Sequence, residues 1–207
     1  MNEQIKSMLR DALILLAITL VAGLALGFVY EVTKAPIANQ ELKAKNDACA
    51  EVFKDATSFE SYEFDGDAAR AVLDDAGLAE EDIDEVMTAL DDGGNQIGYV
   101  LTVTSHEGYG GDITFSMGVK NDGTLNGISI LSISETAGLG MKAKTDEFGE
   151  QWKDKKVDKF EYTKSGATAD NQIDAISGAT ITTNAMTNGV NAGLAYFASI
   201  EGGSGNE

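Results

Sequence analysis

A segment rich in hydroxyl groups, residues 174–183, is the part of this sequence best equipped for chemistry. It reads DAISGATITT and directly precedes an apolar stretch, residues 185–200, whose spacing predicts the last helix. The first turn of a helix has backbone N–H groups without intrahelical partners and lies at the positive end of the helix dipole, so it favours a phosphate. Ordinary helix capping by Ser or Thr explains the same residues. The pattern leaves a phosphate site and a capped helix as two open interpretations.

Two glycine-containing loops are the next candidates for a binding site. Residues 106–111 read HEGYGG and residues 135–140 read ETAGLG, and their glycines permit tight bends or close approach of the backbone to a ligand. The second loop is too short for a Walker phosphate loop and lacks the spacing GxGxxG. His106 has no nucleophile near it in the sequence, so we interpret it as a polar loop residue rather than a catalytic base.

The composition excludes several classes of function. The chain has 207 residues, with 15 Lys and Arg against 34 Asp and Glu, and a net charge of −19. Such a chain is a poor candidate for binding nucleic acid, which requires clustered cations. Cys49 is the only cysteine, so the sequence predicts no disulfide within the chain and no zinc or iron–sulfur site. No metal site is predicted, and a redox cofactor must bind by other means.

The amino-terminal region predicts a membrane anchor. Residues 12–30 are nineteen residues without a charge, and as a helix they extend about 28 Å, which matches the hydrocarbon core of a bilayer. A cleavable signal peptide, with residues 25–27 as the cleavage site, is the alternative; the length of the apolar run favours an uncleaved anchor. Flanking positive charges do not decide the orientation.

The remaining elements must position the candidate residues. Residues 60–92 contain thirteen acids and one base, with apolar positions at helical spacing, which predicts one or two short amphipathic helices with an acidic face. Alternating apolar residues predict three antiparallel strands, at 97–105, 112–119 and 125–134, the last two joined by an Asn-Asp-Gly turn.

We therefore expect an α+β fold in which a single amino-terminal transmembrane helix precedes a domain with an antiparallel sheet and flanking helices. The predicted parts are an amino-terminal tail (1–11), the transmembrane helix (12–30), a helical stalk (31–57), an acidic helical insert (58–94), the ligand-binding domain (95–200) and a flexible tail (201–207).

The hydroxyl-rich segment resembles the flavinylation motif of the FMN-binding domain family. This family includes the G subunit of the Rnf ion-translocating ferredoxin:NAD oxidoreductase complex and the C subunit of the Na⁺-translocating NADH:quinone oxidoreductase. Its motif is Asp-x-x-Ser/Thr-Gly-Ala-Thr, and the matching residues are Asp174, Ser177, Gly178, Ala179 and Thr180. In the family the last Thr carries FMN through a phosphoester bond, so the resemblance assigns this bond to Thr180.

The loop at 135–140 and the Gly-Tyr-Gly-Gly segment at 108–111 also resemble this family. The family loop reads Glu-Thr-Pro-Gly-Leu-Gly and lies beside the isoalloxazine ring; it is matched by Glu135, Thr136, Gly138, Leu139 and Gly140. Ala137 replaces the proline, which removes a fixed φ angle.

A second copy of the SGAT tetrapeptide, residues 165–168, has Tyr162 where the motif has Asp. No apolar helix follows this copy directly. We therefore expect Thr168 to be unmodified.

The resemblance implies a membrane-anchored electron carrier with covalent FMN, and it assigns no catalytic residue to the chain itself. It implies a separate flavin transferase for maturation and other membrane, iron–sulfur and flavin subunits as partners. In such a complex electrons pass between ferredoxin and NAD, coupled to Na⁺ or H⁺ movement, and the FMN domain lies on the extracytoplasmic side of the cell membrane. The short chain favours the Rnf relative over the quinone-reducing one. A non-redox, membrane-anchored acidic binding module stays open as another class.

Overall fold

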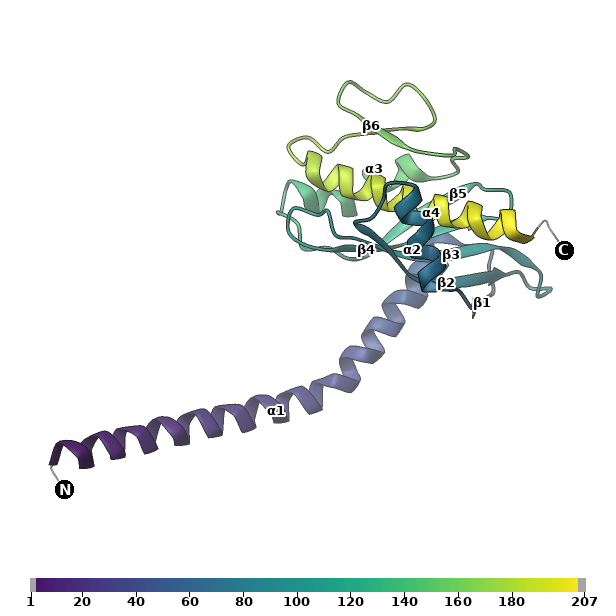
Figure 1. Ribbon diagram of the computed structural model, residues 1–207. Helices are drawn as coiled ribbons and strands as arrows, with labels where there is room; N and C mark the ends of the chain where they lie inside the picture. The colour runs from purple at the N-terminus through teal and green to yellow at the C-terminus, as the bar shows by residue number, and fades with distance from the viewer. Residues whose placement is uncertain (1–2, 205–207) are drawn as a thin grey trace. The chain divides into compact units, whose positions relative to one another are not determined.

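The computed structural model describes residues 3–204, and the chain divides into two compact units, Met1–Ala44 and Lys45–Glu207. Helix α1 spans Glu3–Val52 and contains Pro36 (Figure 1). The predicted anchor and stalk are thus parts of one helix, and residues 53–57 at the end of the predicted stalk lie outside it. At the other end of the chain, residues 201–204 of the predicted tail continue a helix, whereas residues 205–207 lie outside the described part.

The apolar part of α1 meets the requirements of a membrane span. It is the helix, within the described residues, that is long and apolar enough to cross a bilayer. The hydroxyl of Thr19 donates to the backbone carbonyls of Leu15 and Leu16, each at 3.0 Å. Because a hydroxyl without a partner is costly in hydrocarbon, these bonds make Thr19 compatible with a lipid environment.

The second unit contains a five-stranded antiparallel sheet with strand order β1-β2-β3-β4-β5. Its strands are β1 (Ser58–Ser61), β2 (Glu81–Leu90), β3 (Gln96–Ser105), β4 (Ile113–Lys120) and β5 (Leu125–Ser132). Each strand pairs with its neighbour in sequence, so short turns join most of them. The three predicted strands are confirmed as β3, β4 and β5.

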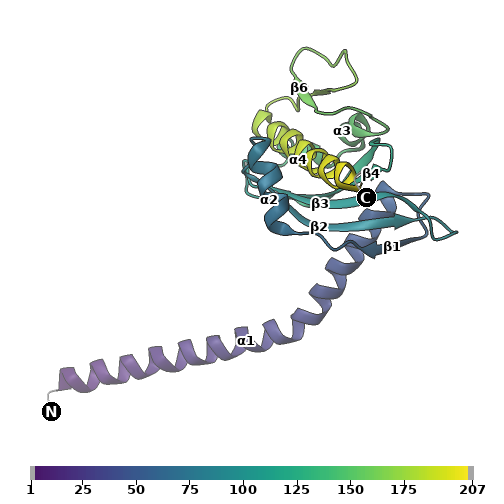
Figure 2. The same ribbon diagram turned by 45° about the vertical axis from the view of Figure 1, so that its right-hand side comes forward.

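Helices α2 (Gly66–Asp75) and α4 (Thr180–Ser204) pack on one face of the sheet, as Figure 2 shows. The main core forms between this face and the helices. The end of α1 packs on the other face, where Cys49, Val52 and Phe53 meet Ala89 and Val100. In β3, Tyr99, Leu101 and Val103 belong to the main core and Val100 lies in the second core, as a strand covered on both faces requires.

The prediction of an acidic helical insert, residues 58–94, is wrong outside α2. Helix α2 forms there, but β1 and β2 are strands that belong to the main sheet. The register of β2 against β3 shifts between Ile83 and Glu85, which is a β-bulge. The bulge changes which face the following residues occupy, so Ile83 and Val86 both reach the main core. Their spacing of three imitates the period of a helix.

The segment between β5 and α4 consists of short elements. They are η1 (Gly140–Lys144), α3 (Asp146–Gly149), η2 (Glu150–Trp152), β6 (Glu161–Thr163) and β7 (Gln172–Asp174). Trp152 stacks edge-on against Phe148 and Phe160, with ring centroids 5.7 and 5.1 Å apart, and anchors this segment to the core. Strands β6 and β7 pair in parallel.

Helix α4 lies close to the sheet because glycines face it. A Cβ atom at Gly193 would collide with the Met117 sulfur, and one at Gly189 would lie 2.9 Å from the Phe115 ring. Replacement of Gly193 by Val should therefore push α4 away from β4 and lower the free energy of unfolding by about 1–3 kcal/mol. Thermal unfolding of the full-length chain in detergent measures this change.

Gly149→Ala is the matched control, because no atom lies within 4 Å of a Cβ at Gly149. Its effect should stay within about 0.5 kcal/mol. Equal effects of the two substitutions would contradict the close packing of α4.

Candidate functional site

A cavity of about 600 Å³ lies where three loops meet the start of α4. Its volume is within the range of about 300–1,000 Å³ that is usual for small-molecule sites. The residues that line it are Tyr109, Glu135, Thr136, Leu139, Gly140, Gly178, Ala179, Thr180, Ile181 and Thr182. The structure thus brings together residues of two segments, 135–140 and 174–183, that the sequence predicts as candidates.

The loop at 135–140 is held by a tight turn. The N–H groups of Leu139 and Met141 donate to the Thr136 carbonyl at 3.1 and 3.2 Å, and Gly138 has a φ of 78°. A four-residue turn with positive φ at its third position needs Gly there and commonly has Pro at its second position. Ala137 occupies that second position. The turn therefore forms without the proline, although the φ of Ala137 is not fixed by a ring.

Two close contacts join this loop to the other walls of the cavity. The buried Glu135 accepts a hydrogen bond at 3.3 Å from the N–H of Gly110, which follows Tyr109. A Cβ at Gly140 would lie 2.5 Å from the Thr182 hydroxyl oxygen and 2.6 Å from Glu135 Oε2. Glycine at 140 is thus what lets the loop approach α4.

The first turn of α4 faces the cavity with free backbone donors. Its first intrahelical hydrogen bond runs from the N–H of Thr183 to the carbonyl of Ala179 at 3.0 Å. The N–H groups of residues 180–182 precede that bond and have no carbonyl to pair with in the helix. Since they also lie at the positive end of the dipole of a 25-residue helix, this end of the cavity favours an anion.

The threonines near the start of α4 have different environments. The Thr183 hydroxyl is fully buried, donates to the Ala179 carbonyl and accepts the Ile176 N–H, each at 3.0 Å. Thr182 is also buried. Thr180 is half-buried, lines the cavity, and has no hydrogen-bond partner for its hydroxyl among residues 3–204. Of these three hydroxyls, the one at Thr180 is accessible and uncommitted.

Thr168, in the second SGAT sequence, lies in a different setting. It is exposed, and its hydroxyl donates to Gln172 Oε1 at 3.1 Å. It lines neither of the two cavities that contain Thr180.

The second of these cavities has a volume of about 350 Å³ and brings Lys164 to Thr180. The other lining residues come from the motif itself, at 175–178. Sequence reasoning missed Lys164, which follows β6, because the parallel pairing of β6 with β7 is what carries it to the motif. The ammonium group supplies positive charge beside the start of α4.

Asp174 and Ser177 do not line the main cavity. Asp174 is exposed and lies with Ser177 along a separate cavity of about 370 Å³. Its carboxylate accepts the N–H of Ala167 at 2.6 Å, and its own N–H donates to Gln151 Oε1 at 2.7 Å. The acidic residue of the motif therefore holds the loop that joins β6 to β7.

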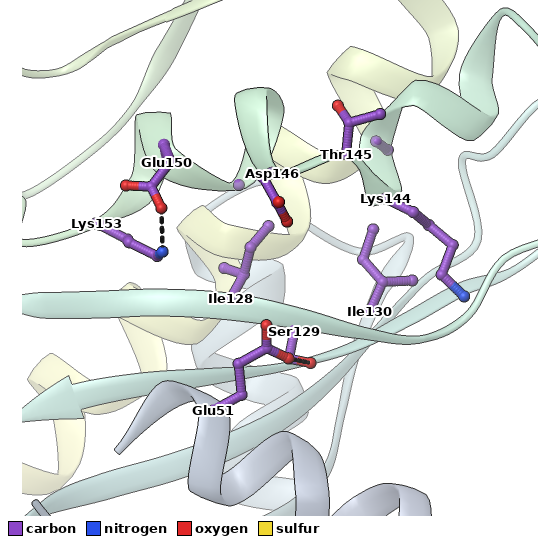
Figure 3. Close-up of a pocket in the computed structure, with 11 residues that line it drawn as sticks. Glu51, Ile128, Ser129, Ile130, Lys144, Thr145, Asp146, Glu150 and Lys153 are labelled. Atoms are coloured by element: carbon purple, nitrogen blue, oxygen red, sulfur yellow. Dashed lines mark hydrogen bonds and ion pairs between the residues drawn. The ribbon is translucent and has the colours of Figure 1, made fainter. Parts of the chain in front are cut away.

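A smaller cavity, of about 160 Å³, lies between β5 and the η1–α3 segment (Figure 3). Glu51, Asp146 and Glu150 line it together with Lys144 and Lys153, and Glu51 accepts a hydrogen bond from Ser129 at 2.5 Å. Its volume falls below the usual range for small-molecule sites. Within residues 3–204, no group of three or more His, Cys, Asp and Glu side chains is arranged to hold a metal ion.

Comparison with known proteins identifies the family. Residues 108–195 match the FMN-binding domain, and residues 1–52 match the RnfG N-terminal region. The G subunit of the proton-translocating ferredoxin:NAD⁺ oxidoreductase complex of Clostridium ljungdahlii is 32% identical over 183 residues, which cover 88% of each chain. The G subunit of the Na⁺-translocating complex of Acetobacterium woodii is 31% identical and covers 94% of each chain. This chain belongs to the RnfG family, the G subunits of ion-translocating ferredoxin:NAD⁺ oxidoreductase complexes.

Solved structures agree with the fold of this family member. NqrC of Shewanella oneidensis is 21% identical with a TM-score of 0.50, over 59% of this chain and 61% of that chain. The C subunit of the Na⁺-translocating NADH-quinone reductase of Parabacteroides distasonis is 22% identical with a TM-score of 0.50, over 70% and 78%. The predicted fold, an amino-terminal apolar helix followed by an antiparallel sheet with helices, is confirmed.

The turn at 136–139 generates a prediction about stability. Ala137→Pro should raise the free energy of unfolding by about 0.4–1 kcal/mol, because proline restricts the unfolded chain at a position whose geometry accepts it. This corresponds to an increase in Tm of about 1–4 °C. Differential scanning calorimetry of the full-length chain measures it. A decrease in Tm would show that the backbone at Ala137 does not have the angles of this turn.

Proposed function

We propose that this chain is the membrane-anchored flavoprotein subunit of an Rnf-type complex and relays electrons through FMN attached to Thr180 by a phosphoester. The observation that carries this proposal is the cavity of about 600 Å³ that joins the 135–140 loop to the free hydroxyl of Thr180. Membership of the RnfG family supports it, since relatives of this chain are named as subunits of ferredoxin:NAD⁺ oxidoreductases that translocate H⁺ or Na⁺.

The cavity suits a flavin ring. Tyr109, Leu139 and Ile181 line it and are 71%, 42% and 52% exposed, which leaves large apolar surfaces without a partner in the described part of the chain. Exposed apolar groups gathered at one cavity are typical of a binding site for a flat aromatic ligand. Glu135 and the backbone of the 135–140 loop add polar groups that orient the ligand.

The other end of the site suits a phosphate. A phosphoester on Thr180 lies at the first turn of α4, where free N–H groups and the helix dipole stabilise negative charge. Lys164 adds a cation beside the same residue. The neighbouring hydroxyl of Thr183 is committed to the backbone, so it keeps the turn in place and leaves Thr180 as the attachment point.

The protein residues have positioning roles in this proposal, and bound FMN supplies the one- and two-electron chemistry. The 135–140 loop, Tyr109 and the first turn of α4 hold and orient the ring. The covalent attachment keeps the cofactor with the protein on the extracytoplasmic side of the membrane, where a dissociated cofactor would be diluted. The ten proposed cofactor-site residues are Asp174, Ser177, Gly178, Ala179, Thr180, Glu135, Thr136, Gly138, Leu139 and Gly140. Asp174 and Ser177 would act in recognition by the flavin transferase.

We further propose that α1 anchors the chain by a single pass in the cell membrane. Its apolar run is long enough to span, and residues 1–52 match the amino-terminal region of RnfG. Partners in this proposal are the other membrane, iron–sulfur and flavin subunits of the complex.

The attachment site is tested by in-gel fluorescence. Wild-type protein, Thr180→Val and Thr168→Val are each produced together with a flavin transferase and run on denaturing gels under ultraviolet light. We expect fluorescence in the wild type and Thr168→Val, and none in Thr180→Val, because Val removes the hydroxyl while it keeps the shape. A fluorescent Thr180→Val protein would exclude the proposed residue, and a dark wild type would exclude covalent flavin altogether.

The role of Lys164 is tested by the rate of the same reaction. Lys164→Gln should slow flavin attachment by up to about fivefold at low salt, because an exposed ion pair contributes up to about 1 kcal/mol. The difference should shrink at high salt. Lys159→Gln removes the same charge from an exposed position that lines none of the described cavities near Thr180, and it should leave the rate unchanged. Equal rates for Lys164→Gln and wild type at low salt would contradict the role.

A further inference from the structure

A buried carboxyl group beneath α4 has no role in the site described above. Glu81, the first residue of β2, is fully buried. Its Oε1 accepts a hydrogen bond from the Ser105 hydroxyl at 3.1 Å, while Oε2 receives no donor from any described residue. An ionised carboxylate in this position would be a buried charge with one oxygen unsatisfied, which is costly.

Glu107 is tied to Glu81 through Ser105, whose hydroxyl donates to Glu81 and accepts the N–H of Glu107 at 3.4 Å. Its Oε2 accepts hydrogen bonds from the side-chain amides of Asn188, at 2.5 Å, and Asn184, at 3.3 Å. Both amides belong to α4, so these bonds tie Glu107 to the helix. The pKa of Glu81 is raised to about 9, and burial is the main cause. The hydrogen bond from Ser105 lowers this pKa. Glu107 raises it, both as an acceptor for the Glu81 proton and through its negative charge.

Among the described residues, no cation compensates this pair. Glu80 is the other charged group that acts on Glu81, and it is also acidic. The nearby His106 bonds to Asp82 and Asp112, each at 2.9 Å, and Arg70 pairs with Asp82. From α4, the residues that face the pair are the uncharged Asn184, Asn188 and Gly189. A proton is the remaining means of neutralising one of the two carboxylates.

The pair connects two walls of the candidate site. Glu107 directly precedes the glycine loop 108–111, whose Tyr109 lines the main cavity. Asn184 and Asn188 follow Thr180 by four and eight residues, so they lie about one and two helical turns further along α4. The glycines cannot hold the loop by their own side chains. The contact of Glu107 with α4 fixes one end of the loop, and the hydrogen bond from the Gly110 N–H to Glu135 fixes the other.

We propose that Glu81 and Glu107 hold one proton between them, and that this shared proton fixes the glycine loop 108–111 against helix α4. Glu81 and Glu107 are then positioning residues for the FMN site. Removal of the proton leaves two adjacent anions without a counter-charge, and their repulsion releases the loop. The positioning role at the FMN site rests on the proposed function, whereas the shared proton is measured on the chain without flavin.

The sign of the pH effect follows from the pKa of Glu81. In the unfolded chain Glu81 loses its proton near its ordinary value of 4.5, whereas the folded chain keeps it up to about 9. Between these values the folded state binds more protons, so the contribution of Glu81 to stability falls as pH rises. One proton changes the unfolding equilibrium constant by about tenfold per pH unit. In Glu81→Gln the side-chain amide can still donate a hydrogen bond to Glu107, but residue 81 no longer gains or loses a proton as pH changes.

The first test is chemical unfolding of the full-length chain without flavin at several pH values from 5 to 9, for wild type, Glu81→Gln and Glu80→Gln. The ratio of the wild-type and Glu81→Gln unfolding constants should grow by up to about tenfold per pH unit. Glu80→Gln removes the same charge from an exposed position and leaves Glu81 in place, so it should keep most of the pH dependence of the wild type. A ratio for Glu81→Gln that is independent of pH overturns the proposal.

The second test is hydrogen exchange of the amides at 106–111, corrected for the intrinsic effect of pH. Wild type should lose protection of this loop above pH 9, and Glu81→Gln should retain it. In Glu107→Gln, where the repulsion is absent, Glu81 should ionise at lower pH than in the wild type. Unchanged protection of the wild-type loop through pH 10 overturns the positioning role.

The third measurement concerns the flavinylated chain. The anisotropy of flavin fluorescence should fall above pH 9 in the wild type and stay constant in Glu81→Gln, because a released loop frees the ring. Equal pH profiles of the two proteins would mean that the pair does not position the FMN site. A wild type that carries no flavin overturns the proposed function and not the shared proton, which the first two tests decide by themselves.

Discussion

The start of helix α4 depends on one hydroxyl group with two hydrogen bonds. Thr183 donates to the carbonyl of Ala179 and accepts the N–H of Ile176, so one buried side chain fixes the turn before the helix and the first helical turn. Ala179 has no side chain that can cap a helix, and the Thr183 hydroxyl accepts an N–H that precedes the helix, so the N–H groups of the first turn stay free. Thr183 thus holds the turn before the helix. The hydroxyl of Thr180 makes no such bond within the described residues, and Thr180 lines the cavity.

Two sets of residues place helix α4 on the sheet: one sets its distance from the sheet and the other sets its position along it. Gly189 and Gly193 permit the close approach, and Asn184, Asn188 and Asn191 make the side-chain contacts that set the position. Asn191 accepts the N–H of Phe160 and donates to its carbonyl at 2.7 and 3.0 Å, which joins α4 to the segment that leads to β6. The aromatic stack of Trp152 and Phe160 continues this connection into the core. These contacts fix the start of β6, and Lys164, which follows β6, lines the same cavity as Thr180.

The sequence predicted an element correctly where its apolar residues keep the spacing of one kind of secondary structure from end to end. Strands β3 and β4 pair in an unbroken register, and residues 12–30 of α1 form an uninterrupted apolar run, so both were predicted from the sequence. The prediction failed at β2, because the bulge after Ile83 adds one residue and converts the period of two into an apparent period of three. The contacts of Lys164 and Glu81 could not be predicted in this way. These contacts depend on the pairing of β6 with β7 and of β2 with β3, and the spacing of apolar residues within a segment does not predict which strands pair.

The two SGAT sequences show why a tetrapeptide does not define an attachment site. Residues 177–180 end at the first turn of α4, between two cavities, whereas residues 165–168 lie in the loop between β6 and β7. Asp174 links the two copies, since its carboxylate accepts the N–H of Ala167 in the second one. The acid of the motif thus has the other SGAT copy as a structural partner, while Thr168 bonds to Gln172. Thr168 is more exposed than Thr180, so the proposed attachment to Thr180 requires a flavin transferase that recognises more than the four residues, such as the helix terminus and the loop that Asp174 holds in place.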